Sequence, residues 1–290
     1  MDSTSESKKS ILIVSDGLFL EHYLVEQFRH KYDVRLLHTD DIAHIKTLQR
    51  HYDTVIYCPT ASENFKHVKG LFQAMETQEP ENMVLISSYE IYGRGSDMDA
   101  VSETSPLEPV SKIGQDLYEC EKVLTKWAGQ KDVKLTILRC GEIIGNNMTG
   151  RIRCMTDRIA SGMYFHIPGY DEGTLVLIHA EDLVAIIDFI IGKKVILNIS
   201  DGYTHYYKET ADAIARRLND KRILTMPRKL VPVIKLLSHV IPSLATMLAL
   251  RSCTITYNND AMMAALEGRG KPRNVTDYLK HMDNQIPTNV

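Results

Sequence analysis

Residues 83–122 constrain the fold of this chain more than any other stretch. Residues 83–93 read M-V-L-I-S-S-Y-E-I-Y-G, a short apolar run with β-branched residues that ends in hydroxyls. Such a run is typical of a buried parallel strand whose carboxyl end opens into a site. After a polar loop, residues 106–124 begin with prolines and then keep helical spacing of apolar residues. The stretch therefore predicts a buried strand, a loop and a helix, as in α/β proteins.

The same stretch resembles the catalytic segment of the extended short-chain dehydrogenase/reductases, the family of NAD-dependent epimerases and dehydratases that act on nucleotide sugars. That family has S-S-x-x-V-Y-G at the strand end and then P-x-x-P-x-S-x-Y-G-x-S-K-x-x-x-E. The matching positions are Ser87, Ser88, Tyr92, Gly93, Pro106, Pro109, Ser111, Gly114, Glu119 and Glu121. The resemblance runs from Ile11 to about Met282. It implies a Rossmann-type doubly wound parallel sheet with a smaller C-terminal α+β lobe for the substrate.

Two catalytic residues of the family are replaced here. By the resemblance, its tyrosine falls on Ile113 and its lysine falls on Leu117. The tyrosine moves the proton of a substrate alcohol, and the lysine lowers the tyrosine pKa and holds the nicotinamide ribose. Isoleucine and leucine can do neither. Ser88, which in the family polarises the same substrate oxygen, is retained, although the alternative interpretation of Ser87 and Ser88 is two small polar residues that close a strand.

A literal Y-x-x-x-K occurs slightly later, at Tyr118 and Lys122. The separation between Ser88 and Ile113 is typical of the family, and Gly114 is then in register. On a helix, a shift of five residues turns a side chain by roughly 140° and advances it about 7.5 Å. Tyr118 and Lys122 are therefore expected to form a surface pair, and a displaced catalytic pair is the alternative.

The segment Ile11–Val14 predicts a first buried strand, and a helix at Leu18–Arg29 follows it at once. A dinucleotide pyrophosphate would bind at such a turn, on the free N–H groups of the helix. The family has G-x-x-G-x-x-G there, whereas this chain reads S-D-G-L-F-L-E. The three glycine positions hold Ser15, Leu18 and Glu21. The residues that the resemblance leaves as remnants of a cofactor site are Gly17, Phe19, Leu20, Asp41 and Ile42.

This turn argues against the usual mode of cofactor binding. Leu18 is bulky, and Asp16 and Glu21 add carboxylates near the phosphates, at a cost on the order of several kcal/mol. The preferred interpretation of the carboxylates themselves is that acidic residues in the first helical turn interact favourably with the helix dipole. The resemblance implies NAD or NADP as the cofactor, but binding in the usual mode is doubted.

The adenosine side of the sheet is predicted to be trimmed. His38 and Thr39 stand where the family has an acidic residue for the ribose. A single helix, roughly Ile42–Arg50, then leads straight into the strand Thr54–Cys58. His67 occupies the place of a family asparagine and is interpreted as a surface or capping residue rather than a catalyst.

The C-terminal half carries further scaffold motifs. L-T-I-L-R-C-G-E-I-I-G (135–145), L-I-H-A-E-D-L-V (177–184) and V-I-L-N-I-S-D-G (195–202) all resemble family elements. Asp182 is expected to cap and pack rather than catalyse. The predicted organisation is a flexible tail at 1–9, a Rossmann-like domain at 10–145 with a return segment at about 175–200, and substrate-lobe segments at 146–174 and 203–290.

The amino-acid composition indicates which partners and which cellular compartment are expected for the protein. A formal net charge of −3 argues against a general nucleic-acid binder. Five scattered cysteines without metal-ligand spacing favour buried thiols in a reducing cytoplasm. The polar residues 1–9 are not expected to be a signal peptide. The apolar stretch Leu230–Leu250 contains Lys235, His239 and Pro242, which argues against a membrane span. A helix pair that caps the substrate lobe is expected, and a peripheral membrane or partner surface is the alternative.

Three functional hypotheses follow. The first is a pseudoenzyme scaffold that binds a nucleotide or nucleotide sugar, or regulates a partner. The second is a divergent NAD(P)-dependent enzyme that uses Ser88 with Tyr89, Tyr92, Tyr118 or His67 as the proton carrier. The third and weakest is a hydrolase or lyase centred on Ser88. The resemblance also implies a homodimer through the helices at Leu117–Trp127 and Val68–Met75.

Overall fold

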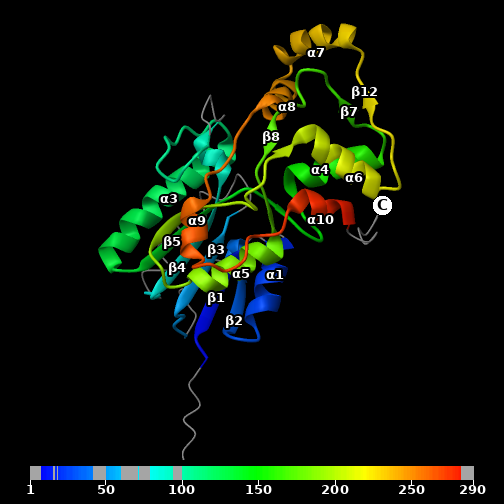
Figure 1. Cartoon of the computed structure of the whole chain (residues 1–290). Helices are drawn as coiled ribbons and strands as arrows, with labels where there is room; N and C mark the ends of the chain where they lie inside the picture. The colour runs from blue at the N-terminus through cyan, green and yellow to red at the C-terminus, as the bar shows by residue number, and fades with distance from the viewer. Residues whose placement is uncertain are drawn as a thin grey trace, which may run out of the picture.

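The centre of the protein is a six-stranded parallel sheet. The computed structural model describes residues 8–15, 17, 19–41, 50–59, 71, 79–93 and 100–281. The strand order is β10-β5-β4-β3-β1-β2 (Figure 1). The strands are β1 (Ser10–Ser15), β2 (Asp33–His38), β3 (Thr54–Cys58), β4 (Asn82–Ser88), β5 (Lys134–Cys140) and β10 (Val195–Ile199). The predicted Rossmann-type sheet is confirmed.

Helices cover both faces of this sheet. Residues 11 and 13 of β1 pack with α1 (Phe19–Phe28), α5 (Ala180–Ile190) and α9 (Asp260–Ala265) in one apolar cluster. Residues 12 and 14 pack on the other face, against Cys120, Leu124 and Trp127 of α3 (Lys112–Lys131). Because successive strand side chains point to opposite faces, a strand buried on both sides must be apolar throughout. This is why β1 and β4 read as unbroken apolar runs.

The trimmed adenosine side is visible at β2. In the described part of the chain, β2 is the edge strand and β1 lies between β2 and β3. Only residue 37 of β2 is buried. The predicted helix at Ile42–Arg50 lies outside the described residues apart from Arg50. The same holds for His67 and, apart from Leu71, for the predicted dimer helix Val68–Met75.

A smaller α+β lobe follows the sheet. Its apolar cluster joins α4 (Gly150–Ala160), α6 (Tyr207–Arg217) and α10 (Val275–His281). Three two-stranded pairs complete it: β6 (Glu142–Ile144) with β9 (Leu177–His179), β7 (Phe165–His166) with β12 (Leu224–Thr225), and β8 (Thr174–Leu175) with β11 (His205–Tyr206). The short helix η3 (Arg228–Leu230) leads into α7 (Val231–Ser238) and α8 (Pro242–Ser252), which stand at the top of the view in Figure 1. No helix among the described residues is long and apolar enough to cross a bilayer.

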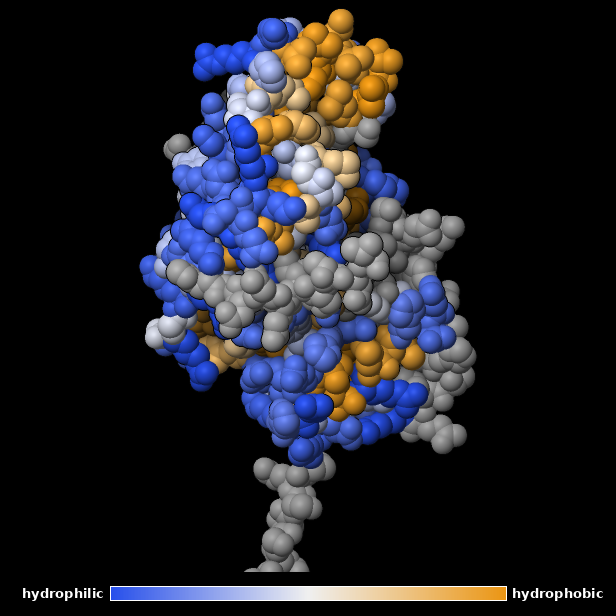
Figure 2. Space-filling view, turned by 90° about the vertical axis from the view of Figure 1, so that its right-hand side faces the viewer, coloured by the Kyte–Doolittle hydropathy of each residue, from blue (hydrophilic) through white to orange (hydrophobic). Residues whose placement is uncertain are grey.

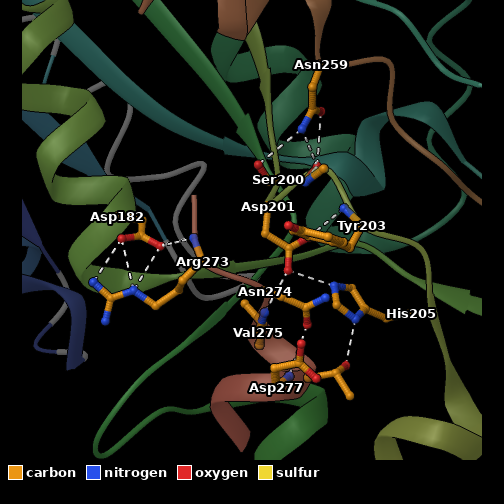
Figure 3. Close-up of polar contacts among 12 residues, drawn as sticks. Asp182, Ser200, Asp201, Tyr203, His205, Asn259, Arg273, Asn274, Val275 and Asp277 are labelled. Atoms are coloured by element: carbon orange, nitrogen blue, oxygen red, sulfur yellow. Dashed lines mark hydrogen bonds and ion pairs between the residues drawn. The ribbon is translucent and has the colours of Figure 1, made fainter. Parts of the chain in front are cut away.

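Buried polar residues fasten the C-terminal helix to the sheet (Figure 3). Asp201, which follows β10, accepts hydrogen bonds from the Val275 N–H at 2.9 Å and the Tyr203 N–H at 3.0 Å. Its Oδ2 is also 2.7 Å from His205 Nε2, and His205 Nδ1 lies 2.6 Å from Thr276 Oγ1. These contacts position the start of α10 against the turn after β10.

Asp182 does not cap α5 as predicted. The N-cap is His179, whose Nδ1 accepts the Glu181 N–H at 3.2 Å. Asp182 lies in the first turn of the helix, where it accepts the Arg273 backbone N–H at 2.9 Å and pairs with the Arg273 guanidinium at 3.0 Å (Figure 3). The packing part of the prediction agrees with this contact between α5 and the segment before α10.

His166 stands between two carboxylates in the smaller lobe. Its Nδ1 is 3.2 Å from Asp171 Oδ2, and its Nε2 is 3.0 Å from Asp212 Oδ1. The hydrogen bond with Asp171 raises the pKa of His166 and outweighs the opposing effect of burial. His179 is the opposite case, because burial lowers its pKa.

These two histidines should shape the pH dependence of stability in opposite directions. The contribution of His166 is complete below about pH 6.5, the ordinary histidine pKa, and is lost as pH rises through its higher folded-state value. The contribution of His179 is complete above about pH 6.5 and declines as pH falls below it. We expect His166→Gln to flatten the alkaline decline and His179→Gln to flatten the acidic one. Urea unfolding at a series of pH values measures both, and an unaltered alkaline limb in His166→Gln would contradict this assignment.

Candidate functional site

A cavity of about 310 Å³ lies at the carboxyl ends of β4 and β5. Five of the residues predicted for the site line it together: Phe19, Leu20, Ser88, Ile113 and Leu117. They come from α1, β4 and α3, which are far apart in the sequence. The carboxyl ends of parallel strands and the helices that flank them meet at one edge of the sheet, where ligands of such folds bind.

Ser88 is the last residue of β4 and faces this cavity. Its hydroxyl accepts the Glu90 N–H at 3.3 Å and so caps the short helix η2 (Tyr89–Tyr92). The neighbouring Ser87 is buried and donates to Glu121 Oε1 at 2.6 Å. Both serines line the cavity, but the Ser87 hydroxyl is engaged with Glu121, whereas the Ser88 hydroxyl caps η2.

The start of α3 brings Ile113 and Leu117 to the cavity. Ser111 caps the helix by accepting the Gly114 N–H at 2.9 Å, and its hydroxyl also hydrogen-bonds Glu90. Gly114 lies against the backbone of η2, and a Cβ there would come within 2.4 Å of the Glu90 carbonyl oxygen. This close approach positions the start of α3, so that Ile113 and Leu117 line the same cavity as Ser88.

Tyr118 and Lys122 lie away from this cavity. The Lys122 ammonium is exposed, pairs with Glu119 at 2.9 Å and sits 5.2 Å from the centre of the Tyr118 ring. Tyr118 is half-buried and packs against the apolar cluster of Tyr89, Ile91 and Leu117. Neither side chain is among the residues that line the cavity.

Three charged residues of the site, Glu90, Glu142 and Arg151, were not predicted from the sequence. Arg151, near the start of α4, lies between two carboxylates, 3.6 Å from Glu142 and 3.8 Å from Glu90. Tyr89 donates its hydroxyl to Glu142 Oε1 at 3.2 Å. Burial raises the pKa of Glu142 even though Arg151 acts to lower it, and burial raises the pKa of Tyr89 well above its ordinary value. The only sequence signal was that Glu90 lies inside the motif of the catalytic segment and Glu142 inside a motif that was interpreted as scaffold.

A second cavity of about 470 Å³ adjoins the first. The two share Tyr89, Glu90 and Arg151, so these side chains form the wall between them. The second cavity lies between the smaller lobe and the start of α3, where Val110, Ser111 and Lys112 line it. The residues that line it on that lobe are Thr174, Val176, Ala249, Cys253 and Ile255.

Of the remaining predicted cofactor residues, Gly17 and Asp41 are described, and neither lines the first cavity. Gly17 has φ +86°, and a Cβ there would lie 3.1 Å from Nε2 of His38 at the end of β2. Gly17 and Asp41 are both exposed and absent from the cavity lining, and Glu21 lies in the first turn of α1. Asp16, Leu18 and Ile42 lie outside the described residues. Among the residues that the structure does describe, no cluster of three metal-ligating side chains occurs.

Comparison with known proteins resolves the family. The model of the NAD dependent epimerase/dehydratase family matches residues 34–200, more than half of the chain. The chain belongs to this family. Among curated proteins, no sequence matches it.

Solved structures of this family share the fold at low sequence identity. UDP-glucose 4-epimerase of Thermus thermophilus, in complex with NAD, has a TM-score of 0.75 at 14% identity over 97% of this chain and 100% of that one. UDP-N-acetylglucosamine 4-epimerase of Methanobrevibacter ruminantium, in complex with UDP-N-acetylmuramic acid, has a TM-score of 0.74 at 14% identity over 94% and 96%. UDP-glucose 4-epimerase of Thermotoga maritima, with UDP-glucose, has 0.72 at 15% over 94% and 96%.

Proposed function

We propose that this family member binds a nucleotide sugar, or a related nucleotide, without the hydride chemistry of the epimerases. The observation that carries the proposal is that Ile113 and Leu117 line the same cavity as Ser88. By the resemblance, other members of the family have a tyrosine and a lysine at these two positions. Neither aliphatic side chain can accept the proton of a substrate alcohol or place a positive charge beside it. A binding or regulatory role follows.

The residues at the β1–α1 turn do not fit a dinucleotide bound in the usual mode. The His38 side chain packs close to Gly17. By the resemblance, His38 also stands where the family has an acidic residue that binds the adenosine ribose. Ile113 and Leu117 offer no hydroxyl or ammonium to the nicotinamide ribose. The family match begins at residue 34, after this turn. NAD and NADP are therefore expected to bind weakly or in another orientation.

The second cavity is the preferred place for the ligand. Its volume lies within the range of about 300–1,000 Å³ that is common for small-molecule sites. Arg151 and Lys112 supply cationic donors on its walls, and Ser111 supplies a hydroxyl. Structural relatives crystallised with UDP-glucose and UDP-N-acetylmuramic acid support the choice of a nucleotide sugar.

We expect UDP-glucose or UDP-N-acetylglucosamine to stabilise the protein, and NAD or NADP not to. A ligand at a hundredfold its Kd adds about 2.7 kcal/mol of stability. For a chain of this size that raises the Tm by about 5 °C. Thermal unfolding with each compound at millimolar concentration measures the effect.

A matched pair of variants locates the ligand. Val110→Trp places a bulky ring at the rim of the second cavity, where Val110 is 58% exposed. It should abolish the shift caused by the nucleotide sugar. Val123→Trp on the outer side of α3 should leave that shift unchanged. A shift of several degrees with NAD, or equal behaviour of the two variants, would count against the proposal.

A divergent enzyme is the second candidate, because Tyr89 and Glu142 line the same cavity as Ser88. The raised pKa of Tyr89 suits a proton donor rather than a base. If this candidate holds, Ser88→Ala and Tyr89→Phe each lower turnover of a nucleotide sugar by at least about tenfold. In the same turnover assay, Tyr118→Phe tests whether the displaced pair of Tyr118 and Lys122 takes part in catalysis.

The remaining sequence expectations stay proposals. They are the domain boundaries near residues 10, 145 and 203, a cytoplasmic location and a homodimer that uses Leu117–Trp127 of α3. The five cysteines are thiols, three of them buried, which suits a reducing compartment.

A further inference from the structure

The tip of the smaller lobe carries an exposed apolar surface, here called the α7 apex. Every residue of α7 is at least partly exposed. Leu236 is 70% exposed and Val240 is 79% exposed. The other members of the α7 apex are Leu230, Val233, Leu237 and Ile241. Figure 2 shows this apolar patch at the top of the molecule, at the level of α7 in Figure 1.

The sequence segment that contains the α7 apex carries basic residues and no acidic residue. No aspartate or glutamate occurs between Lys221 and Asn259, although the whole chain has a formal net charge of −3. The exposed basic residues of the segment are Lys221, Arg222, Arg228, Lys229 and Lys235. In the described part of the structure, none of these five enters an ion pair with another residue. Their charges are therefore available to an anionic partner.

We propose that the α7 apex docks onto the surface of an anionic lipid bilayer. Exposed aliphatic side chains beside unpaired lysines and arginines are the combination that binds the interface of anionic membranes. At eight residues, α7 is far too short to span a bilayer, so the apex lies in the headgroup region.

The charge distribution disfavours a second copy of this chain as the occupant. Two apices face to face would bring their basic residues together, and like charges at an interface oppose association. An anionic bilayer instead neutralises these residues while it covers the aliphatic side chains. The positive charge of this segment therefore favours binding to an anionic bilayer over self-association.

Docking would place a cavity close to the membrane. The helix α8 begins at Pro242, next to the apex, and its residue Ala249 lines the second cavity. At 1.5 Å per residue these two positions are about 10 Å apart along the helix. The docking itself does not depend on what that cavity binds.

Vesicle sedimentation of the full chain tests the proposal. We expect binding to vesicles of phosphatidylcholine mixed with phosphatidylglycerol in equal parts, weaker binding to phosphatidylcholine alone, and release by high salt. Leu236→Asp with Val240→Asp should lower the partition coefficient by about tenfold or more. Arg228→Glu with Lys229→Glu should do the same.

Matched controls use exposed residues elsewhere on the fold. Val123→Asp on α3 replaces an exposed aliphatic residue, and Lys126→Glu with Lys134→Glu reverses two exposed charges. Both should bind vesicles like the unmodified chain. Equal binding by the apex and control variants overturns the proposal. So does the absence of vesicle binding, or a concentration-dependent dimer that Leu236→Asp abolishes, because the second copy would then be the occupant.

Discussion

Replacing Glu121 by alanine is expected to lower the free energy of unfolding by about 3–5 kcal/mol. Glu121 and Arg139 form an ion pair with an N–O distance of 2.8 Å, and their side chains are only 5% and 4% exposed. Glu121 also accepts the Ser87 hydroxyl, which ties α3 to β4. Without the carboxylate, a buried guanidinium loses its counter-charge and a buried hydroxyl loses its acceptor.

Urea unfolding measures this loss against a control on the same helix. Glu119 pairs with Lys122 at the surface, so Glu119→Ala should cost less than about 1 kcal/mol. The double change Glu121→Leu with Arg139→Met removes both charges and should recover part of the stability that Glu121→Ala loses. Equal costs for Glu121→Ala and Glu119→Ala would show that the buried pair contributes no more than a surface pair.

Replacing Gly114 by alanine is expected to destabilise the protein by about 1–3 kcal/mol. The added Cβ would lie 2.4 Å from the Glu90 carbonyl oxygen and 2.9 Å from its carbon, so α3 must move away from η2. That movement also displaces Ile113 and the Ser111 cap. The nucleotide-sugar affinity proposed for the adjoining cavity should fall as well.

Gly129→Ala on the same helix is the matched control. Nothing lies within 4 Å of a Cβ at Gly129, which is exposed. Alanine loses less conformational freedom on folding than glycine, so this change should stabilise the protein by about 0.5–1 kcal/mol. The two substitutions should therefore have opposite signs in the same urea experiment. A stabilising Gly114→Ala would mean that α3 and η2 are not in close contact.

Most of the sheet was predictable because each buried strand corresponds to a short run of apolar residues in the sequence. The apolar run that forms β4 and the strand at Thr54–Cys58 were both predicted with their observed places. The trimmed adenosine side followed from the short distance in sequence between β2 and β3. Asp182 was misassigned because helix capping depends on where the backbone leaves the strand, and here it leaves at His179.

The candidate site was only half predictable. Ser88, Ile113 and Leu117 were found through the register of one continuous motif. Glu90, Glu142 and Arg151 belong to three separate segments, and nothing in their local sequence indicates that they meet. Their grouping depends on how α4 packs against the ends of β4 and β5.

The family, the parallel sheet and the aliphatic residues that line the cavity with Ser88 could be predicted from the amino-acid sequence alone, because these features lie in short runs with a fixed period or spacing. The charged wall between the two cavities and the exposure of α7 at the tip became evident only in the folded chain. An apolar pattern predicts which side chains avoid water, but it does not predict whether another helix or strand covers them. That outcome depends on long-range packing, which also decides which distant charges become neighbours.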